Sequence, residues 1–187
     1  QLLSRFKSVP PSEFHTYKIL PSSTVLFETV IMPDFKPGQR RGRPVSQSAS
    51  GFAEKLREFT GEELTRAYIN IKGRPVEENT LIIYELRNRV QAEQLFLQEP
   101  GSSNEISYFE PDEQTKIPVY KTAFSGMINS FLPDFAPGCD DSYFTFYDNF
   151  LITGSSFVTI SRLLYDNMLK KTLENNLVYH DFESTLP

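Results

Sequence analysis

The most constraining feature of this sequence is a turn-forming phrase that occurs twice, as PDFKPG at residues 33–38 and as PDFAPG at residues 133–138. Proline fixes φ at about −65° and lacks an amide donor, while glycine adopts backbone conformations that are closed to other residues. Each copy therefore ends one element and redirects the chain, and neither contains a nucleophile or a base. The segments after the two copies differ, so the pair predicts two corners of a sheet rather than an internal repeat.

The composition is that of a packed globular domain. The chain has 187 residues, of which 39% are hydrophobic, and it contains sixteen Phe and nine Tyr. A chain of this length buries a core without disulfides or metal ions as staples. The single cysteine, Cys139, excludes an intramolecular disulfide and a cysteine-based zinc cage. We expect residues 1–16 to be a loosely packed lead-in and residues 17–187 to form one domain, cut from a longer protein.

Charge and hydropathy restrict the partners. The net charge of −5 opposes a polyanionic partner, so we expect no nucleic-acid binding. The sequence has no apolar stretch near the ~20 residues that a membrane helix needs. Contact with a membrane would therefore require an anchor outside this chain. No motif for a cofactor is present, and we expect none.

Strands are predicted where β-branched and aromatic residues run between turn residues. They cover residues 24–31, 67–71, 80–86, 117–123, 143–147 and 150–153. Pro118 is typical of a strand start or a sheet edge. The last two strands form a hairpin around Asp148 and Asn149, in which we expect Asn149 to take a φ above zero.

Capping patterns predict the helices. Ser50 begins a helix to about residue 59, Thr60 and Glu63 form a capping box for a short second turn, and Asn88 with Gln91 caps a helix to residue 98. A single helical turn is expected at 127–132 and a last short helix at 178–186. The longest helix opens at residues 154–155, and its apolar face comprises Phe157, Ile160, Leu164, Met168 and Leu169.

These elements predict an α+β fold. The sheet is antiparallel or mixed, helices pack mainly on one of its faces, and a pair of helices ends the chain. Strict alternation of strands and helices is absent, which disfavours a doubly wound parallel sheet.

A basic loop contains the sharpest local motif. Arg41-Gly42-Arg43-Pro44 has the letters of an AT-hook, whose arginines enter the minor groove of A·T-rich DNA. Few further basic residues flank it, and the chain is acidic. We therefore interpret Arg40, Arg41 and Arg43 as a solvated basic loop that can contact an acidic protein or a phosphate group.

The aromatic run at residues 143–150 has two interpretations. The run can form a stacking platform for a sugar or a peptide. Alternatively, one face of a strand in this run belongs to the core, and the alternating spacing of the aromatic residues favours this second interpretation. Tyr143 and Tyr147 are the candidate binding residues of this run. The whole run comprises Tyr143, Phe144, Phe146, Tyr147 and Phe150.

No catalytic or metal motif is complete. Ser4 and Lys7 have the SxxK spacing of penicillin-binding enzymes, but Lys121-Thr122-Ala123 lacks the glycine of their KTG strand. The two histidines, His15 and His180, are expected to be structural or solvent-exposed. Four aspartates near the second turn do not meet the calcium-loop pattern, so no metal ligands are assigned: Asp134, Asp140, Asp141 and Asp148.

The last quarter of the chain resembles a family of uncharacterised, membrane-anchored bacterial cell-envelope proteins that is classed only as a domain of unknown function. In that family a YF-x-x-x-DN-x-L-x-x-G-x-S hairpin leads into a long helix, and a Y-x-x-F-x-x-x-L helix follows. The matching residues are Tyr143, Phe144, Asp148, Asn149, Leu151, Gly154, Ser156, Tyr179, Phe182 and Leu186. The resemblance implies an α+β domain on the periplasmic side of the cell envelope, and it implies no catalytic residues.

Two classes of function are left open. The first is a non-catalytic envelope domain that binds a protein or a glycan, which predicts exposed apolar surface around the second turn and at the C-terminal helix. The second is a hydrolase whose catalytic set is completed by sequence outside this chain, which predicts polar groups that converge in a concave pocket. The absence of a complete catalytic motif favours the binding domain; its partner and oligomeric state are not specified by the sequence.

The interpretation of the basic loop is testable. We expect the chain at low-micromolar concentration to leave an A·T-rich DNA duplex unshifted in a gel at about 50 mM salt, because an acidic protein gains little from so few phosphate contacts. A shift that disappears when Arg41 and Arg43 are replaced by alanine would contradict this expectation.

Overall fold

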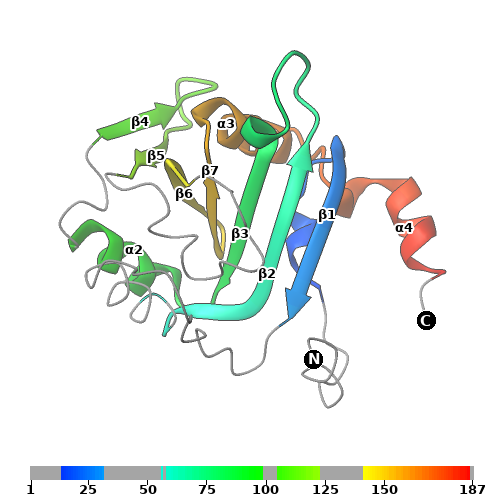
Figure 1. Ribbon diagram of the computed structural model, residues 1–187, viewed down its shortest axis with the longest axis horizontal. Coiled ribbons are helices and arrows are strands. Elements are labelled where there is room, and N and C mark those ends of the chain that lie inside the picture. The colour runs from blue at the N-terminus through cyan, green and yellow to red at the C-terminus, as the bar shows by residue number, and fades with distance from the viewer. Residues whose placement is uncertain (1–13, 32–55, 57, 99–104, 123–140, 186–187) are drawn as a thin grey trace, which may run out of the picture.

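The computed structural model describes residues 14–31, 56, 58–98, 105–122 and 141–185 (Figure 1). Within these ranges one sheet contains the strands β1 Thr24–Ile31, β2 Thr60–Ile69, β3 Thr80–Leu86, β4 Glu105–Phe109, β5 Ile117–Lys121, β6 Tyr143–Tyr147 and β7 Phe150–Gly154. The α-helices are α2 Arg89–Gln98, α3 Phe157–Met168 and α4 Leu177–Glu183. Short 3-10 helices are η2 Thr16–Lys18, η3 Glu77–Asn79 and η5 Leu173–Asn175.

The strands form a seven-stranded sheet in the order β1-β2-β3-β7-β6-β5-β4, and every pair of neighbours is antiparallel. The sheet thus joins two meanders, β1-β2-β3 and β4-β5-β6-β7, through the pairing of β3 with β7. In register, Leu81 lies opposite Gly154 and Glu85 lies opposite Phe150. The α+β fold class, the antiparallel sheet and the C-terminal pair of helices are confirmed.

Both faces of the sheet are apolar, because successive strand residues point to opposite sides. Ile82 and Tyr84 pack with Phe96 of α2 on one face. Leu81 and Ile83 pack on the other face with α3, η2 and η5. Helix α2 therefore covers one face, and α3 with the C-terminal elements covers the other.

Several predicted elements are confirmed at their bounds. The strands predicted at 24–31 and 80–86 are β1 and β3. The side chain of Asn88 accepts a hydrogen bond from Gln91 N at 3.1 Å, so the predicted cap of α2 is present. The predicted hairpin is formed by β6 and β7, although the residue with positive φ is Asp148 (φ 51°) rather than Asn149. Aspartate and asparagine both tolerate this conformation.

One expectation about the second strand was wrong. Thr60 and Glu63 do not cap a helix; they lie in β2, which begins at Thr60 rather than at residue 67. Hydrogen-bonding partners on β1 and β3 outweigh the local capping signal, as tertiary context often does. Pro118 lies at the start of β5, which confirms the first of its two predicted positions; the sheet edge is formed instead by β4, a strand that was not predicted.

Helix α3 is capped by Ser156, whose side chain accepts a hydrogen bond from Val158 N. Its buried face includes Ile160 and Leu164, as the spacing predicted. Met168 and Leu169 are exposed instead of buried, since the chain turns away at Lys170, where φ is 53°. The apolar face that contacts the sheet therefore ends one turn earlier than predicted.

Residues 14–16 pack against the sheet, whereas we expected the lead-in to be loose. Phe14 stacks on Phe27 of β1 with ring centroids 5.3 Å apart, and Thr16 is fully buried. Several sequence predictions lie outside the described residues: both PDF-PG phrases, most of the helix at 50–59, the turn at 127–132, and the segment from Ser4 to Lys7. No helix in the described ranges is long and apolar enough to cross a membrane.

The packing of Gly154 gives a test of the β3–β7 register. A Cβ at this position would lie 2.7 Å from Leu81 Cδ2, and Leu81 is fully buried. We expect Gly154→Ala to lower the free energy of unfolding by about 1–3 kcal/mol in urea titrations, because the core is overpacked.

The matched control is the same substitution in a Leu81→Ala background. Leu81→Ala alone creates a cavity and costs about 2–5 kcal/mol, but it also removes the atom that the new methyl group meets. Gly154→Ala should therefore cost less in that background than in the parent chain. Equal costs in the two backgrounds would contradict the register.

Candidate functional site

A bulge in β2 positions the candidate site. Thr60 pairs with Leu86 and Leu64 pairs with Tyr84, so four residues of β2 span what two residues of β3 span. Bulges redirect side chains and increase local twist. Gly61 lies in this bulge, and a Cβ there would lie 2.6 Å from Glu85 Oε2, so the glycine leaves the space that the carboxylate occupies.

Glu63, at the end of the bulge, is a buried carboxylate with several hydrogen bonds. Its side chain is 3% exposed. Oε2 accepts a hydrogen bond from His15 N at 2.6 Å, and Oε1 accepts one from Thr16 N at 2.8 Å. The Thr16 hydroxyl also donates to Oε1. A carboxylate is tolerated in the interior when backbone amides and hydroxyls satisfy its oxygens in this way.

Two further threonines extend this polar cluster into the sheet. The Thr65 hydroxyl lies 3.2 Å from the Thr16 hydroxyl and 2.7 Å from the Thr29 hydroxyl of β1. Glu63 and Thr65 are two residues apart on β2 and therefore lie on the same face of the sheet. The cluster thus ties the N-terminal segment to both β1 and β2.

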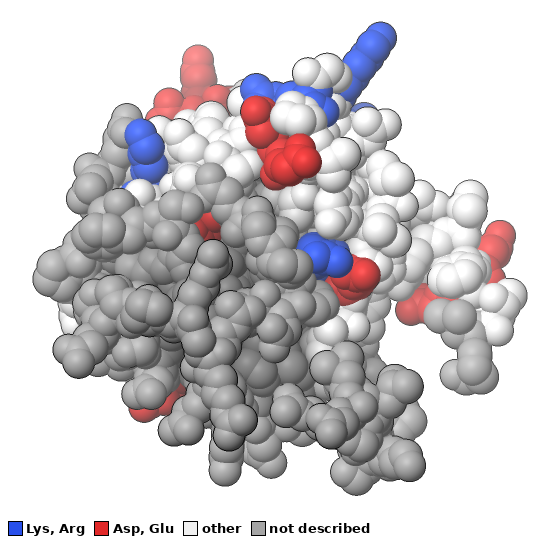
Figure 2. Space-filling view, viewed as in Figure 1, with Lys and Arg blue, Asp and Glu red and all other residues white. Residues whose placement is uncertain are grey.

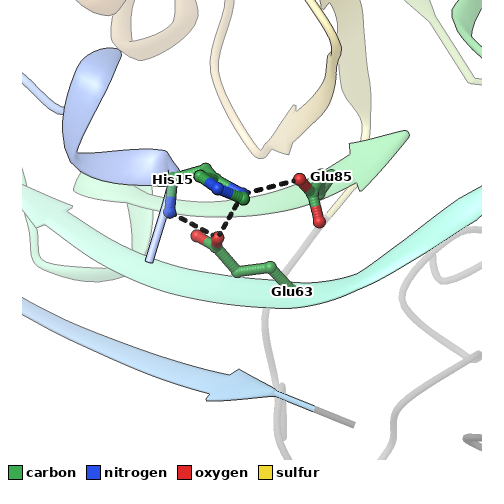
Figure 3. A group of neighbouring side chains, drawn as sticks. All are labelled: His15, Glu63 and Glu85. Carbon is green, nitrogen blue, oxygen red and sulfur yellow. Dashed lines mark hydrogen bonds and ion pairs between the residues drawn. The ribbon is translucent and has the colours of Figure 1, made fainter. Parts of the chain in front are cut away.

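His15 and Glu85 complete the site (Figure 3). His15 Nδ1 lies 2.9 Å from Glu85 Oε1 and 3.8 Å from Glu63 Oε2. The three side chains come from the segment before η2, from β2 and from β3, and they point toward one another. Their side-chain exposures are 37% for His15 and 26% for Glu85, so solvent reaches the site from one side.

The site opens into a hollow of about 260 Å³. It is lined by His15, Ile31, Gly61, Glu62, Glu63, Glu85, Leu86 and Arg87. The lining holds one imidazole, three carboxylates and one guanidinium, and the ligand atoms of His15, Glu63 and Glu85 all lie within 4.8 Å of one another. An imidazole and two carboxylates at this spacing are donors suited to a divalent cation.

The predicted binding residues lie elsewhere. Tyr143 and Tyr147, at the two ends of β6, are half-buried and pack against the core that contains α3. Burial raises the pKa of the Tyr147 phenol, and the neighbouring Asp148 raises it further. Phe144 and Phe146 are buried on the opposite face. Arg40, Arg41 and Arg43 lie outside the described residues, so their role stays a prediction.

The sequence pattern gives His15 and Glu63 separate roles and gives Glu85 none. His15 is predicted to be a structural or solvent-exposed histidine, and Glu63 is predicted to belong to a capping box. Residues 15, 63 and 85 are distant in sequence, and only the pairing of β2 with β3 and the position of η2 bring them together. A local motif could not have found this cluster.

The C-terminal helix carries a second candidate surface. No residue of α4 is buried, and Leu177, Val178 and Phe182 are 80%, 78% and 57% exposed. In the space-filling view the surface over α4 is mostly uncharged, with some acidic side chains (Figure 2). We call Leu177, Val178 and Phe182 the α4 apolar surface.

Comparisons with known proteins do not place the chain in a family. No protein-family model matches it, and no curated protein or solved structure matches it significantly. The functional conclusions therefore depend on the geometry of the site and of α4.

The hydrogen bonds of Glu63 give a test of its role. We expect Glu63→Gln to lower the free energy of unfolding by about 1.5–3 kcal/mol, because an amide group would replace one of the oxygens that accept from backbone amides and the bonds would lose their charge. The measurement is chemical denaturation at neutral pH.

Glu62→Gln is the matched control. Glu62 is the preceding residue, and its ion pair with Arg87 is exposed on both sides. Exposed pairs contribute little, so this change should cost no more than about 0.5 kcal/mol. Equal effects at positions 62 and 63 would show that Glu63 is not an anchor.

Proposed function

We propose that this chain is a non-catalytic interaction domain of the cell envelope that binds a protein partner through the α4 apolar surface. The observation that carries the proposal is the exposure of Leu177, Val178 and Phe182 on one short helix. Exposed apolar residues that gather in one place are typical of interaction sites. Exposed apolar surface at the C-terminal helix was also the feature that the sequence predicted for a binding domain.

Helix α4 is held in place, which makes this surface available to a partner. Asn176 caps it, accepting hydrogen bonds from Val178 N and Tyr179 N. Tyr179 stacks on Tyr17 of η2, with ring centroids 6.0 Å apart, and burial raises the pKa of its phenol. One side of α4 therefore contacts the domain, and Val178 and Phe182, four residues apart, lie together on another side.

The chemistry of the surface favours a protein over a glycan. Leucine and valine side chains offer no hydrogen bonds to sugar hydroxyls, and Phe182 is the single aromatic ring of the α4 apolar surface. An apolar groove or helix of another protein would bury these side chains. The envelope location is proposed from the resemblance of the last quarter of the chain to envelope proteins.

A hydrolase is the second candidate, and one observation favours it. Polar groups converge in the hollow at His15, Glu63 and Glu85. The described residues that line this hollow include no serine, threonine or cysteine nucleophile. Hydrolysis there would therefore have to use an activated water, which requires a base or a bound metal ion.

Photo-crosslinking in cells that make the full-length protein tests the proposed interaction. A photo-reactive amino acid is placed at Leu177 and, as the matched control, at Val90 of α2, which is 65% exposed. We expect one dominant protein adduct from position 177 that is absent from position 90. The partner identified in this way is then purified for binding measurements.

With the purified partner, Leu177→Ser and Phe182→Ser should each weaken binding about 10- to 100-fold, because each loses about 1.5–3 kcal/mol of apolar burial. Val90→Ser should leave binding unchanged. Identical adducts at positions 177 and 90, or none at 177, would overturn the proposal. Recovery of the full-length protein in the cytosolic fraction would contradict the envelope location.

A further inference from the structure

We propose that His15, Glu63 and Glu85 bind a divalent transition-metal ion of the zinc type. The ligand atoms would be His15 Nδ1, Glu63 Oε2 and Glu85 Oε1, which lie together in Figure 3. A nitrogen and two carboxylate oxygens suit zinc, whereas calcium and magnesium prefer oxygen ligands alone. This inference goes beyond the proposed interaction at α4 and does not depend on it.

Two of the distances between the proposed ligand atoms lie near those expected around a tetrahedral ion. Ligand atoms about 2.0–2.2 Å from zinc lie about 3.4 Å from one another. His15 Nδ1 lies 2.9 Å from Glu85 Oε1 and 3.8 Å from Glu63 Oε2, on either side of that value. All three ligand atoms lie within 4.8 Å of one another, and rotations of the His15 and Glu85 side chains, which are both partly exposed, would close them around an ion. The metal ion would take the place of the direct contact between His15 Nδ1 and Glu85 Oε1.

The surroundings of Glu63 are those of a supported metal ligand. Metal-binding carboxylates are commonly oriented by further hydrogen bonds. Glu63 Oε1 accepts from Thr16 N and the Thr16 hydroxyl, which fix the carboxylate. Oε2 accepts from His15 N. Because a carboxylate oxygen has two lone-pair directions, Oε2 keeps one for a metal ion.

The charge and openness of the site agree with this assignment. Two carboxylates beside one imidazole leave the cluster with net negative charge, which a divalent ion would neutralise. The hollow of about 260 Å³ lies beside the ligands, so a fourth position would face solvent and hold water. Three protein ligands and an open position are the arrangement of catalytic zinc sites rather than of closed structural ones, and a hydrolase, the second candidate function, would use such an arrangement.

Titration of the metal-free protein with Zn²⁺ tests the proposal. Binding is measured by calorimetry and by competition with a chromogenic chelator. We expect one ion per chain and a rise in Tm, because binding to the folded state alone stabilises it. Co²⁺ should produce the visible absorption of a tetrahedral site with nitrogen and oxygen ligands. Ca²⁺ and Mg²⁺ should leave Tm unchanged at the same concentration.

Variants assign the ligands. His15→Ala and Glu85→Gln should each weaken Zn²⁺ binding at least 10-fold, as loss of a ligand does. His180→Ala is the matched control, since His180 is the other histidine and lies near Glu183 on α4, and it should bind as the parent does. Glu85 is partly exposed and glutamine has the same size as glutamate. The Glu85→Gln variant should therefore fold even if the His15→Ala variant does not.

Three results would overturn the proposal. These are less than one ion per chain, equal binding by the parent and Glu85→Gln, or loss of binding in His180→Ala with binding retained in His15→Ala. In each of these cases the cluster is only an ion pair that ties the N-terminal segment to the sheet. None of them changes the crosslinking expected at α4, so failure of the metal site is distinguishable from failure of the proposed function.

Discussion

The pairing of β3 with β7 is the contact on which the rest of the described structure depends. Each of the other strand pairs joins strands that are consecutive in the described sequence, whereas β3 and β7 are separated by α2 and the whole second meander. Five residue pairs in register, from Leu81–Gly154 to Glu85–Phe150, fix the two meanders relative to each other. Because side chains alternate along both strands, this register also decides which residues enter each core. Glu85 stands at the end of the paired region, and its place beside His15 depends on the pairing of β2 with β3.

The N-terminal segment connects the cluster of His15, Glu63 and Glu85 to the helix that carries the α4 apolar surface. His15 and Thr16 are held by the carboxylate of Glu63, and the next residue, Tyr17, carries the ring on which Tyr179 of α4 stacks. Leu20 O also accepts a hydrogen bond from Leu173 N, just before α4. Residues 15–20 therefore contact both Glu63 of the candidate site and the elements that support the α4 apolar surface. A change that releases Glu63 would loosen the support of α4 as well, although the two surfaces share no residue.

The sequence predicted the parts of the fold whose signals are local. Residues 24–31 and 80–86 carry β-branched side chains between turn residues, and both are strands at the predicted bounds. The cap at Asn88 and the hairpin around Asp148 are likewise local, and both are present. The capping box predicted at Thr60 and Glu63 does not form because both residues have other partners. Thr60 pairs with β3, and the Glu63 carboxylate accepts from the amides of His15 and Thr16.

The candidate site could not be predicted in the same way. Its ligand atoms come from residues 15, 63 and 85, and no spacing rule connects them. A bulge that adds two residues to β2 turns Glu63 toward η2, and sequence patterns do not show where a strand bulges. The exposure of Leu177, Val178 and Phe182 on α4 was expected only from the binding-domain interpretation, because burial depends on tertiary neighbours that the sequence does not show.

The two PDF-PG phrases lie at corresponding places in the order of the described strands. One lies in the sequence between β1 and β2 and the other between β5 and β6. Among the described elements, β2, β3 and α2 follow the first phrase, and β6, β7 and α3 follow the second. If β4 is left aside, the sheet order is symmetric about the β3–β7 pair. The strands β1, β2 and β3 approach this pair from one side in the same way that β5, β6 and β7 approach it from the other. A two-fold axis between antiparallel β3 and β7 would be perpendicular to the sheet and would place both helices on one face. Helices α2 and α3 instead pack on opposite faces. The two halves therefore share an order of strands but are not rotated copies of the same packing.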